Sequence, residues 1–283
     1  MSKKIGFVDY YISEWHASHY PEWIAQANEV LGTDYQVAYA WAELDVSPLD
    51  NVTTDQWCEK YGAERCETIE QLCEKSDYII VLAPSDPDKH LGYAQKVLPF
   101  GKRTYIDKTF APNYAVAKRI FDIAAQYHTP FFSTSALRYA TELKEIGDVR
   151  SIIVTGSGSN FEEYNIHMVE MAVMLLKDPA VRVKVESLAR QRICRVETKN
   201  GKDAAIVYSP SASYMVMAQQ EDGKCCKQLV TSAFFVELLR TILEFFENGV
   251  QPFPAEQTLE VMRLRDALLA GEAADGQWVQ VGV

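Results

Sequence analysis

The sequence predicts an α/β fold: a Rossmann-like domain with a parallel sheet, then a smaller α+β domain with an antiparallel sheet. In the first half, apolar strand-like runs alternate with helix-like segments, as in a parallel sheet covered on both faces. In the second half, the turn signals Asn200-Gly201 and Asp222-Gly223 separate neighbouring strand-like runs, which favours hairpins and an antiparallel sheet. We place a dinucleotide-binding domain at residues 1–136 and a substrate and oligomerisation domain at 137–283, with a C-terminal helix that can pack back on the first domain.

The first domain is expected to alternate strands and helices along the chain. The helix Glu14–Leu31 rests on the helical spacing of Tyr20, Ile24 and Ala27, and Thr68 begins a Thr-x-x-Gln capping box. The expected strands are Lys4–Val8, Tyr35–Trp41, Tyr78–Ala83, Arg103–Asp107 and Pro130–Ser133, and the other expected helices are Asp55–Tyr61, Thr68–Lys75, Pro87–Leu98 and Asn113–Tyr127.

The pattern changes near Leu137, where the second domain begins. We expect a helix over Leu137–Ile146, a Gly/Ser-rich turn at Gly156–Ser159 and a helix over Tyr164–Leu176. The expected strands are Val149–Gly156, Val181–Gln191, Ala204–Tyr208, Tyr214–Gln219, Lys227–Thr231 and Trp278–Val281, and two further helices cover Ala233–Glu247 and Ala255–Ala270.

The composition excludes several classes of protein. The 283 residues include 28 Lys and Arg against 39 Asp and Glu, for a net charge of −11. This acidic balance disfavours a general nucleic-acid binder, which needs positive charge against phosphate. No apolar run approaches the roughly 20 residues of a membrane span, and the run Ile5–Asp9 is too short for a secretory signal. We therefore expect a cytoplasmic protein with no membrane partner. The six cysteines lack metal-ligand spacing, so we expect reduced structural thiols and no metal site.

The first strand-to-helix turn lacks the glycines of a dinucleotide-binding loop. It reads Asp9-Tyr10-Tyr11-Ile12-Ser13-Glu14, whereas the glycines of G-x-G-x-x-G let the backbone approach a pyrophosphate. Because Asp9 and Glu14 bring negative charge to this turn, the turn taken alone argues against ordinary NAD(P) binding. We expect a bound pyrophosphate to be held less closely, by the backbone N–H groups of residues 11–13. Tyr10 and Tyr11 occupy the loop and are candidates to stack on a ligand ring.

Four later segments resemble the glucose-fructose oxidoreductase / inositol dehydrogenase family (Gfo/Idh/MocA). Ala83–His90 resembles its strand-end proline followed by a helix-starting histidine. Gly101–Thr109 resembles its GKhVxxEKP segment, with the lysine retained as Lys108. Ser135–Tyr139 resembles the crossover into the second domain, and Glu163–Glu170 resembles the DxxxHxxD helix. The order and spacing of all four segments fit the family.

The resemblance implies roles for individual residues. It places Lys108 at the active centre, where an ammonium stabilises a developing alkoxide, and it makes His167 the general base. Glu163, one helical turn earlier, would orient His167. Judged from the residues alone, Lys108 is a strand-end surface lysine and His167 a core histidine. The candidate cofactor-binding residues are Tyr10, Tyr11, Ile12, Ala83, Pro84, Ser85, His90 and Asp107, with a structural role favoured for His90, and the candidate substrate-binding residues are Arg138, Tyr139, Asn160 and Tyr164.

Together these residues predict an NAD(P)-dependent oxidoreductase acting on a secondary alcohol of a sugar, polyol or related small molecule. NAD is slightly favoured, because no basic residue is placed for a 2′-phosphate. The alternative is a non-redox sugar-binding or regulatory protein of the same fold that has lost dinucleotide binding. A third possibility is a lyase or hydrolase with a tightly held NAD. An antiparallel sheet covered on one face leaves the other open, which favours a homo-oligomer such as a dimer.

Overall fold

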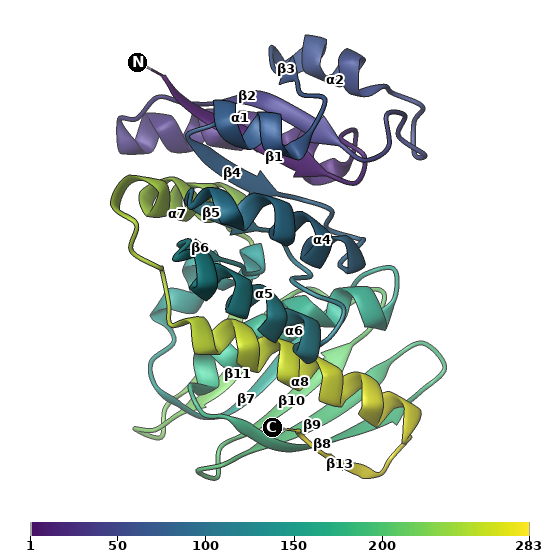
Figure 1. Cartoon of the computed structure of the whole chain (residues 1–283). Helices are drawn as coiled ribbons and strands as arrows, with labels where there is room; N and C mark the ends of the chain where they lie inside the picture. Colours follow the sequence, from purple (N-terminus) through teal and green to yellow (C-terminus); the bar gives the residue numbers. More distant parts are fainter. Residues whose placement is uncertain (1, 283) are drawn as a thin grey trace. The chain divides into compact units, whose positions relative to one another are not determined.

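The computed structural model describes residues 2–282, which form two compact units (Figure 1). The first unit contains the chain up to Thr134 together with Phe235–Ala255, and the second contains Ser135–Phe234 together with the chain from Glu256 onward. The chain therefore passes between the units three times, whereas the sequence analysis places one boundary after residue 136. The segment that returns to the first unit contains a helix that packs on the first sheet.

The first unit is built on an entirely parallel sheet, as predicted. It has six strands, of which the short edge strand Glu64–Arg65 was not expected. The strand order is β3-β2-β1-β4-β5-β6. Because this order reverses direction between β1 and β4, the sheet has a topological switch point there, and ligands of such sheets bind outside the carboxyl ends of the strands. The strands are β1 (Lys3–Asp9), β2 (Tyr35–Ala42), β3 (Glu64–Arg65), β4 (Tyr78–Val81), β5 (Thr104–Ile106) and β6 (Phe131–Phe132).

The helices of the first unit begin at caps that the sequence supplies. Thr53 and Gln56 form a complete capping box at the start of one helix, and the Thr68 hydroxyl accepts from the backbone N–H of Gln71 at the start of the next. Asn113 caps another helix in the same way. The helices are α1 (Trp15–Leu31), α2 (Thr54–Tyr61), α3 (Ile69–Lys75), α4 (Asp88–Val97), the 3-10 turn η1 (Leu98–Phe100), α5 (Tyr114–Tyr127) and α7 (Phe234–Asn248).

Helices cover both faces of the first sheet because neighbouring residues of β1 point to opposite sides. Phe7 faces α1, where its ring meets Tyr20 edge to face with centroids 6.4 Å apart. Gly6 faces α3, where a Cβ would lie only 2.5 Å from a methyl carbon of Leu72, so this strand position requires glycine. On the Phe7 face, Tyr78 of β4 stacks on Phe246 of α7 at 4.7 Å. The first unit is thus a three-layer sandwich around a buried sheet.

The second unit is built on a seven-stranded sheet in the order β12-β11-β7-β10-β9-β8-β13. All neighbouring pairs are antiparallel except β7 and β10, which run parallel. Two long helices, α6 (Phe161–Leu176) and α8 (Ala255–Ala273), lie on one face of this sheet in Figure 1. The strands are β7 (Val149–Gly156), β8 (Ala180–Ser187), β9 (Arg192–Thr198), β10 (Asp203–Tyr208), β11 (Met215–Gln220), β12 (Cys225–Leu229) and β13 (Trp278–Gln280).

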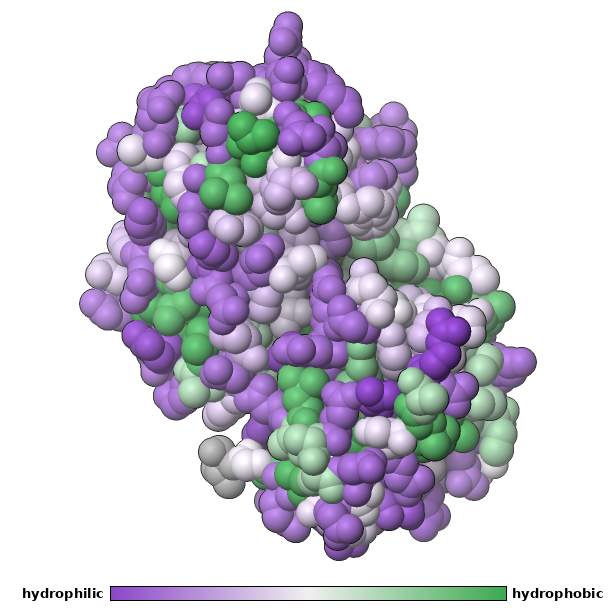
Figure 2. All heavy atoms as spheres, turned by 90° about the vertical axis from the view of Figure 1, so that its right-hand side faces the viewer, coloured by the Kyte–Doolittle hydropathy of each residue, from purple (hydrophilic) through white to green (hydrophobic). Residues whose placement is uncertain are grey.

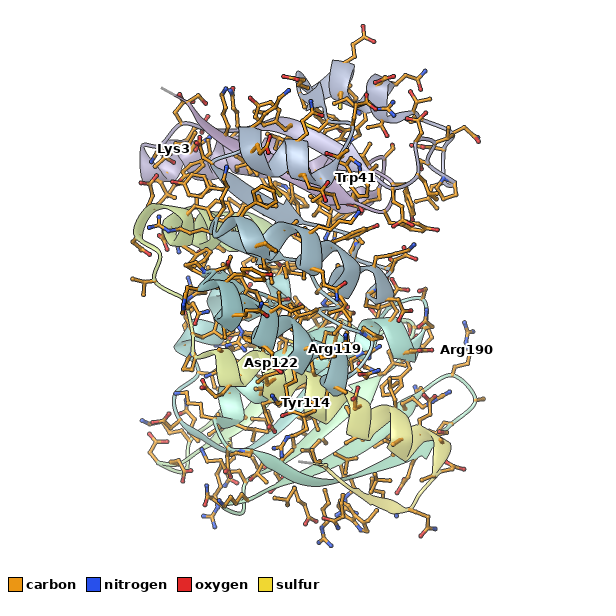
Figure 3. The ribbon with its side chains drawn as sticks, in the orientation of Figure 1. Lys3, Trp41, Tyr114, Arg119, Asp122 and Arg190 are labelled. Atoms are coloured by element: carbon orange, nitrogen blue, oxygen red, sulfur yellow. The ribbon has the colours of Figure 1, made fainter. Side chains whose placement is uncertain are left out.

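Two predictions for the second unit were wrong. The expected helix over 137–146 is a pair of 3-10 turns, η2 (Ala136–Tyr139) and η3 (Thr141–Glu145), because the N–H of Thr141 donates to the Ser232 hydroxyl instead of continuing a helix. The expected strand Val181–Gln191 ends at Ser187, and a turn closed by Leu188 N–H to Gln191 carbonyl leads into the unpredicted β9. Arg190 lies at the tip of this turn (Figure 3).

The surface is mainly hydrophilic, with apolar residues in small groups on the face drawn in Figure 2. Within residues 2–282, no helix combines the length and apolar character needed to cross a membrane. The six cysteines are free thiols, and no group of His, Cys, Asp or Glu within the described residues is arranged to hold a metal ion.

Candidate functional site

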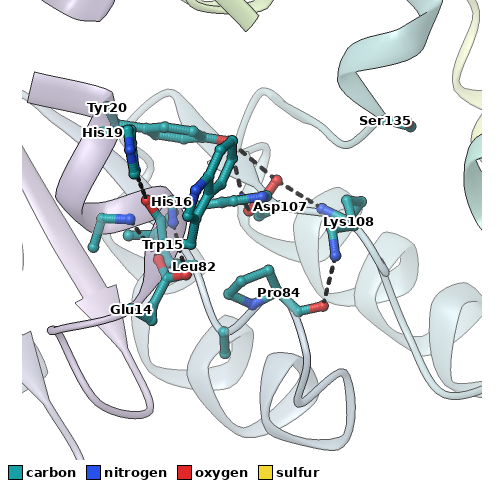
Figure 4. A network of polar contacts seen from close by, with 12 residues as sticks. Glu14, Trp15, His16, His19, Tyr20, Leu82, Pro84, Asp107, Lys108 and Ser135 are labelled. Carbon is teal, nitrogen blue, oxygen red and sulfur yellow. Dashed lines mark hydrogen bonds and ion pairs between the residues drawn. The ribbon is translucent and has the colours of Figure 1, made fainter. Parts of the chain in front are cut away.

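Five ionisable side chains gather at the carboxyl edge of the first sheet. We call Asp9, Glu14, His16, Asp107 and Lys108 the strand-end cluster. Asp9 ends β1, Asp107 and Lys108 follow β5, and Glu14 and His16 belong to the start of α1. All five are less than 10% exposed. Figure 4 shows four of the five: Glu14, His16, Asp107 and Lys108. The cluster therefore lies where a doubly wound sheet binds its ligands.

Asp107 is the centre of the strand-end cluster. Its carboxylate pairs with Nδ1 of His16 and accepts from the hydroxyls of Tyr20 at 3.3 Å and Tyr105 at 3.1 Å. The backbone N–H of Lys108 donates to it at 2.9 Å. Burial works to raise the pKa of the Asp107 carboxyl, but His16 and Lys108 outweigh burial and hold that pKa below its usual value. Asp107 is thus a fixed anion that orients the imidazole of His16.

Lys108 places an ammonium between the ends of β4 and β5. Its Nζ donates to the carbonyl of Pro84 at 3.3 Å (Figure 4). His90 lies beneath this edge, fully buried, with its ring nitrogens against the carbonyls of Leu82 and Phe110. Burial lowers the pKa of His90, and its ring links the segments that follow β4 and β5. The structure therefore gives His90 a positioning role for the segment that carries Lys108.

Asp9 joins the ends of β1 and β4. Its Oδ1 accepts from the backbone N–H of Tyr10 at 2.7 Å and of Ala83 at 2.9 Å. Ala83 has a left-handed backbone, with φ of 67°. Burial, followed by the nearby charge of Glu14, raises the pKa of the Asp9 carboxyl well above its usual value. The strand-end N–H groups are therefore already satisfied by a side chain of the protein.

Glu14 occupies the N-terminus of α1. It is the N-cap residue, and its carboxylate accepts from the backbone N–H groups of His16, at 2.7 Å, and Ala17. The sequence analysis expects the N–H groups of residues 11–13 to hold a pyrophosphate. The Glu14 carboxylate takes the first N–H groups of α1, those of His16 and Ala17, because a glutamate side chain is long enough to fold back over its own helix. The expectation for residues 11–13 stays a prediction.

The end of β2 carries a second acid with internal partners. Glu43 accepts from Lys89 Nζ at 2.6 Å and from the Tyr93 hydroxyl at 2.8 Å. Lys89 also lies over the ring of Tyr10, 4.3 Å from its centroid. Trp41, labelled on β2 in Figure 3, packs edge to face on Tyr93. In dinucleotide-binding folds an acid in this region bonds the ribose, and here that acid is held by a lysine and a tyrosine.

The remaining cofactor candidates of the first unit differ in exposure. The rings of Tyr10 and Tyr11 are half-buried and 5.7 Å apart, so both lie beside the turn as expected. Ile12 is 1% exposed and belongs to the core. Pro84 is buried and Ser85 is exposed at the end of β4.

A dinucleotide fits this unit in part. Lys108 and the β4 end at Pro84 and Ser85 suit the nicotinamide end, because they present an ammonium and polar backbone at the carboxyl edge of the sheet, next to the switch point. The pyrophosphate position suits an anion only when the Glu14 carboxylate is away from α1, since two negative groups cannot share the same N–H donors. The chain therefore offers a nucleotide site with one internal anion in it.

His167 is the centre of a second set of polar residues, in the second unit. It lies on α6, and its Nδ1 is 2.7 Å from Oγ of Ser135. Ser135 is fully buried and caps η2 by accepting from the N–H of Leu137. When Nδ1 of His167 donates to Ser135, Nε2 remains the basic nitrogen. The rings of Tyr164 and Tyr214 flank His167 at 5.8 and 5.9 Å.

The Gly/Ser turn before α6 is shaped by tyrosines. The Tyr214 hydroxyl donates to the carbonyl of Ser157 at 2.7 Å, and the Tyr208 hydroxyl donates to the carbonyl of Gly158 at 2.9 Å. A Cβ on Gly158 would lie 1.9 Å from Cγ of Tyr164, so only glycine lets the Tyr164 ring lie against the turn. The turn therefore fixes the two rings that flank His167.

The other site candidates on α6 and η2 have structural partners. Asn160 is the N-cap of α6: its Oδ1 accepts from the N–H of Glu163 at 2.8 Å, and its Nδ2 donates to Glu163 Oε2 at 3.3 Å. Arg138 is buried, pairs with Glu170 and donates from Nη1 to Oε1 of Gln257 at 2.7 Å. Tyr139 is half-buried in η2. In this structure Asn160 starts the helix and Arg138 holds η2 to α6.

Sequence reasoning missed three residues of these sets. His16 and Ser135 were given no chemical role, and Tyr214 was only part of a strand. Each meets its partner across a long stretch of chain: His16 pairs with Asp107, and Ser135 with His167. No spacing of residues in the sequence indicates that these side chains are hydrogen-bond partners. The one available signal for His16 was its place directly after the strand-end turn, beside Glu14.

The fold of the chain is similar to solved oxidoreductase structures over its whole length. A probable dehydrogenase from Thermotoga maritima has a TM-score of 0.79 at 14% identity and covers 98% of this chain and 98% of its own. GenD2 from gentamicin A biosynthesis, solved in complex with NAD, has a TM-score of 0.78 at 13% identity and covers 100% and 97%. An aldose-aldose oxidoreductase from Caulobacter crescentus, complexed with glycerol, has a TM-score of 0.72 at 13% identity and covers 99% and 100%.

The sequence matches no protein-family model and no curated protein. The structural likeness confirms the fold expected from the sequence resemblance, a Rossmann-like unit followed by a unit with a largely antiparallel sheet. At these identities the likeness establishes the fold alone, so the chemistry rests on the residues.

Proposed function

We propose that the chain is an NAD(P)-dependent oxidoreductase acting on a secondary alcohol of a sugar, polyol or related small molecule. The observation that carries the proposal is the buried ammonium of Lys108 at the carboxyl edge of a parallel sheet, beside the end of β4. The similar structures include one with NAD bound and one that oxidises and reduces aldoses by its name, which supports both the cofactor and the substrate class.

Lys108 acts on the oxygen of the reacting alcohol. As the C–H bond breaks, negative charge develops on that oxygen, and an ammonium within hydrogen-bond reach stabilises it. The neighbouring Asp107 carboxylate and the Pro84 carbonyl hold the lysine in place. Removing such a charge typically costs on the order of a hundred- to a thousandfold in kcat.

His167 takes the hydroxyl proton. In the productive tautomer its Nδ1 donates to Ser135, so Nε2 accepts the proton from the substrate. The rings of Tyr164 and Tyr214 lie beside the imidazole, and aromatic rings suit the apolar C–H surface of a sugar. Glu163, on the same face of α6 one turn earlier, would orient the imidazole or accept from a second substrate hydroxyl.

The bound nicotinamide would supply the hydride acceptor. In the first unit, the backbone and side chains of residues 83–85 would hold it near Lys108, with Tyr10 and Tyr11 beside the turn, and Glu43 favours NAD through the ribose hydroxyls. In this proposal, Lys108 and residues 83–85 stabilise the oxygen and bind the cofactor, and His167 is the base.

The proposal is tested by measuring NAD(H) and NADP(H) binding calorimetrically, then NADH formation with a panel of aldoses and inositols. Lys108→Met should keep nucleotide binding and lower kcat about a thousandfold. Lys118→Met is the matched control, because Lys118 is an exposed lysine of α5 that pairs with Asp122, and it should leave kcat unchanged. Failure of all four nucleotides to bind at millimolar concentration contradicts the proposal, as does full activity of Lys108→Met.

A second candidate is a sugar-binding protein of the same fold without redox chemistry. The Glu14 carboxylate at the start of α1 favours it, because that anion stands where a pyrophosphate would bind. This candidate predicts that sugars raise the melting temperature while nicotinamide nucleotides have no effect.

We further propose a homo-oligomer formed through the uncovered face of the second sheet. The residues that point away from α6 and α8 include Ile153 on β7, Val207 on β10 and Met217 on β11, and Ile153 is 39% exposed. A second copy of the chain would cover these apolar residues. Light scattering should give a dimer or larger assembly, and a monomer contradicts this proposal.

A further inference from the structure

The N-terminus of α1 already holds an anion that belongs to the chain itself. Helix starts present unpaired backbone N–H groups and a partial positive charge, and in nucleotide-binding sheets the helix after β1 gives them to the pyrophosphate. Here the Glu14 carboxylate accepts from His16 and Ala17 N–H. It is 8% exposed. The donors that a pyrophosphate needs are therefore in use.

From this contact, and resting on the proposed function, we propose that Glu14 is an internal competitor for the dinucleotide pyrophosphate. Nucleotides bind only when the Glu14 side chain leaves the start of α1. The residue thereby sets the affinity for phosphate-bearing ligands while leaving the nucleoside part of the ligand unaffected. It is a specificity-determining residue of the cofactor site.

A second observation points the same way. The neighbouring carboxylate of Asp9 takes the N–H groups of Tyr10 and Ala83 through Oδ1, and its buried Oδ2 has no hydrogen-bond partner among residues 2–282. A phosphate brought to this turn would meet the side-chain oxygens of Glu14 and Asp9, which already accept from the nearby backbone N–H groups. The turn is therefore built around internal carboxylates, and repulsion with a bound phosphate is expected as long as Glu14 stays in place.

The Glu14 side chain can leave without breaking an ion pair. Within the described residues its carboxylate is held by backbone N–H groups, and the imidazole of His16 pairs with Asp107 instead. Rotation of the Glu14 side chain would therefore free the N–H groups at the start of α1. A phosphate oxygen would then accept from these N–H groups in place of the Glu14 carboxylate. This makes the competition a direct exchange of anions at a single position.

The test compares ligands with and without phosphate on variants of Glu14. Dissociation constants for NAD⁺, ADP and adenosine are measured by calorimetry on the full chain and on Glu14→Ala and Glu14→Gln. Glu14→Ala should bind NAD⁺ and ADP at least tenfold more tightly, which corresponds to about 1.4 kcal/mol, and adenosine with unchanged affinity. Glu14→Gln should shift in the same direction by less, because its amide oxygen can still cap α1 without the charge. Glu22→Ala, an exposed glutamate of the same helix, should change nothing.

The outcomes separate this inference from the proposed function. Equal NAD⁺ affinity in the full chain and in Glu14→Ala overturns the inference and leaves the oxidoreductase proposal standing. An equal gain for adenosine also overturns it, because the effect would then not depend on phosphate. If none of the proteins binds NAD⁺ or NADP⁺, both proposals fall. Should Glu14→Ala not fold, Glu14→Gln keeps the cap and decides the question by the same comparison.

Discussion

Buried charge is arranged differently in the two units. In the second unit, Arg138 and Glu170 form a pair of one cation and one anion, both less than 10% exposed, that holds η2 to α6. In the first unit, the strand-end cluster contains three carboxylates against one lysine and one histidine. Its excess carboxylates are held mainly by backbone N–H groups.

The difference separates a structural use of charge from a chemical one. Breaking a matched buried pair strongly lowers the free energy of unfolding, because removing one partner leaves the other charge buried without a partner. An unmatched cluster can exchange a proton or an anion with a ligand, since its members are perturbed by burial and by each other. Arg138, expected from the sequence to bind substrate, therefore lies in the matched pair, whereas Glu14, expected only to bring negative charge to the turn, lies in the unmatched cluster.

The largest expected effect breaks the matched pair. Glu170→Ala removes the carboxylate that pairs with the buried Arg138 guanidinium, so we expect a loss of about 3–5 kcal/mol in the free energy of unfolding. Urea denaturation followed by circular dichroism measures it. Glu162→Ala, at an exposed position in the first turn of the same helix, is the control and should cost about 0.5 kcal/mol. Equal losses in both variants would show that the pair is not structural.

The contrast also explains which parts of the fold the sequence predicts. The five expected strands of the first sheet follow from their pattern, because each is a short apolar run, and several of the helices have a local cap such as Thr53 or Asn113. The helix expected at 137–146 does not form, because Thr141 and Glu142 form hydrogen bonds with Thr231 and Ser232, which are far away in sequence. Local propensity cannot foresee that competition.

The sequence predicted only those site residues that lie in recognisable local motifs. Lys108 and His167 come from motif-like segments, and the structure places Lys108 at the strand end as expected. The partners of these residues come from elsewhere: Asp107 meets His16 of α1, and His167 meets Ser135. The capture of the helix start by Glu14 depends on a side-chain conformation, which the sequence of the turn does not specify.

A smaller effect concerns the unmatched cluster and its pH dependence. Burial raises the pKa of Asp9 above its usual value of 3.8, so between these two pKa values the folded protein binds more protons than the unfolded chain. Stability due to Asp9 is therefore lost as pH rises through that window. Asp9→Asn keeps an oxygen for the N–H groups of Tyr10 and Ala83 and removes the titration. Its stability relative to the unmodified protein should rise between pH 4 and 7, by about 1 kcal/mol.

Urea unfolding at a series of pH values measures this difference, and contributions from groups distant from Asp9 cancel in it. Asp34→Asn, at an exposed position before β2, is the control and should show no trend. A constant difference between Asp9→Asn and the unmodified protein over this range would mean that Asp9 is an ordinary member of a balanced network.

The smallest expected effect tests whether the strand end is strained. Ala83 has φ of 67°, a left-handed conformation that costs a residue with a Cβ about 1 kcal/mol. Ala83→Gly removes this cost but gives the unfolded chain more freedom, which returns part of the gain, so we expect a stabilisation of about 0.5 kcal/mol. The same change at Ala25, an exposed position within α1, should destabilise by about 1 kcal/mol. Opposite signs, measured as shifts in urea midpoint, would show that Asp9 holds the end of β4 in a conformation its sequence disfavours; equal losses would mean that it does not.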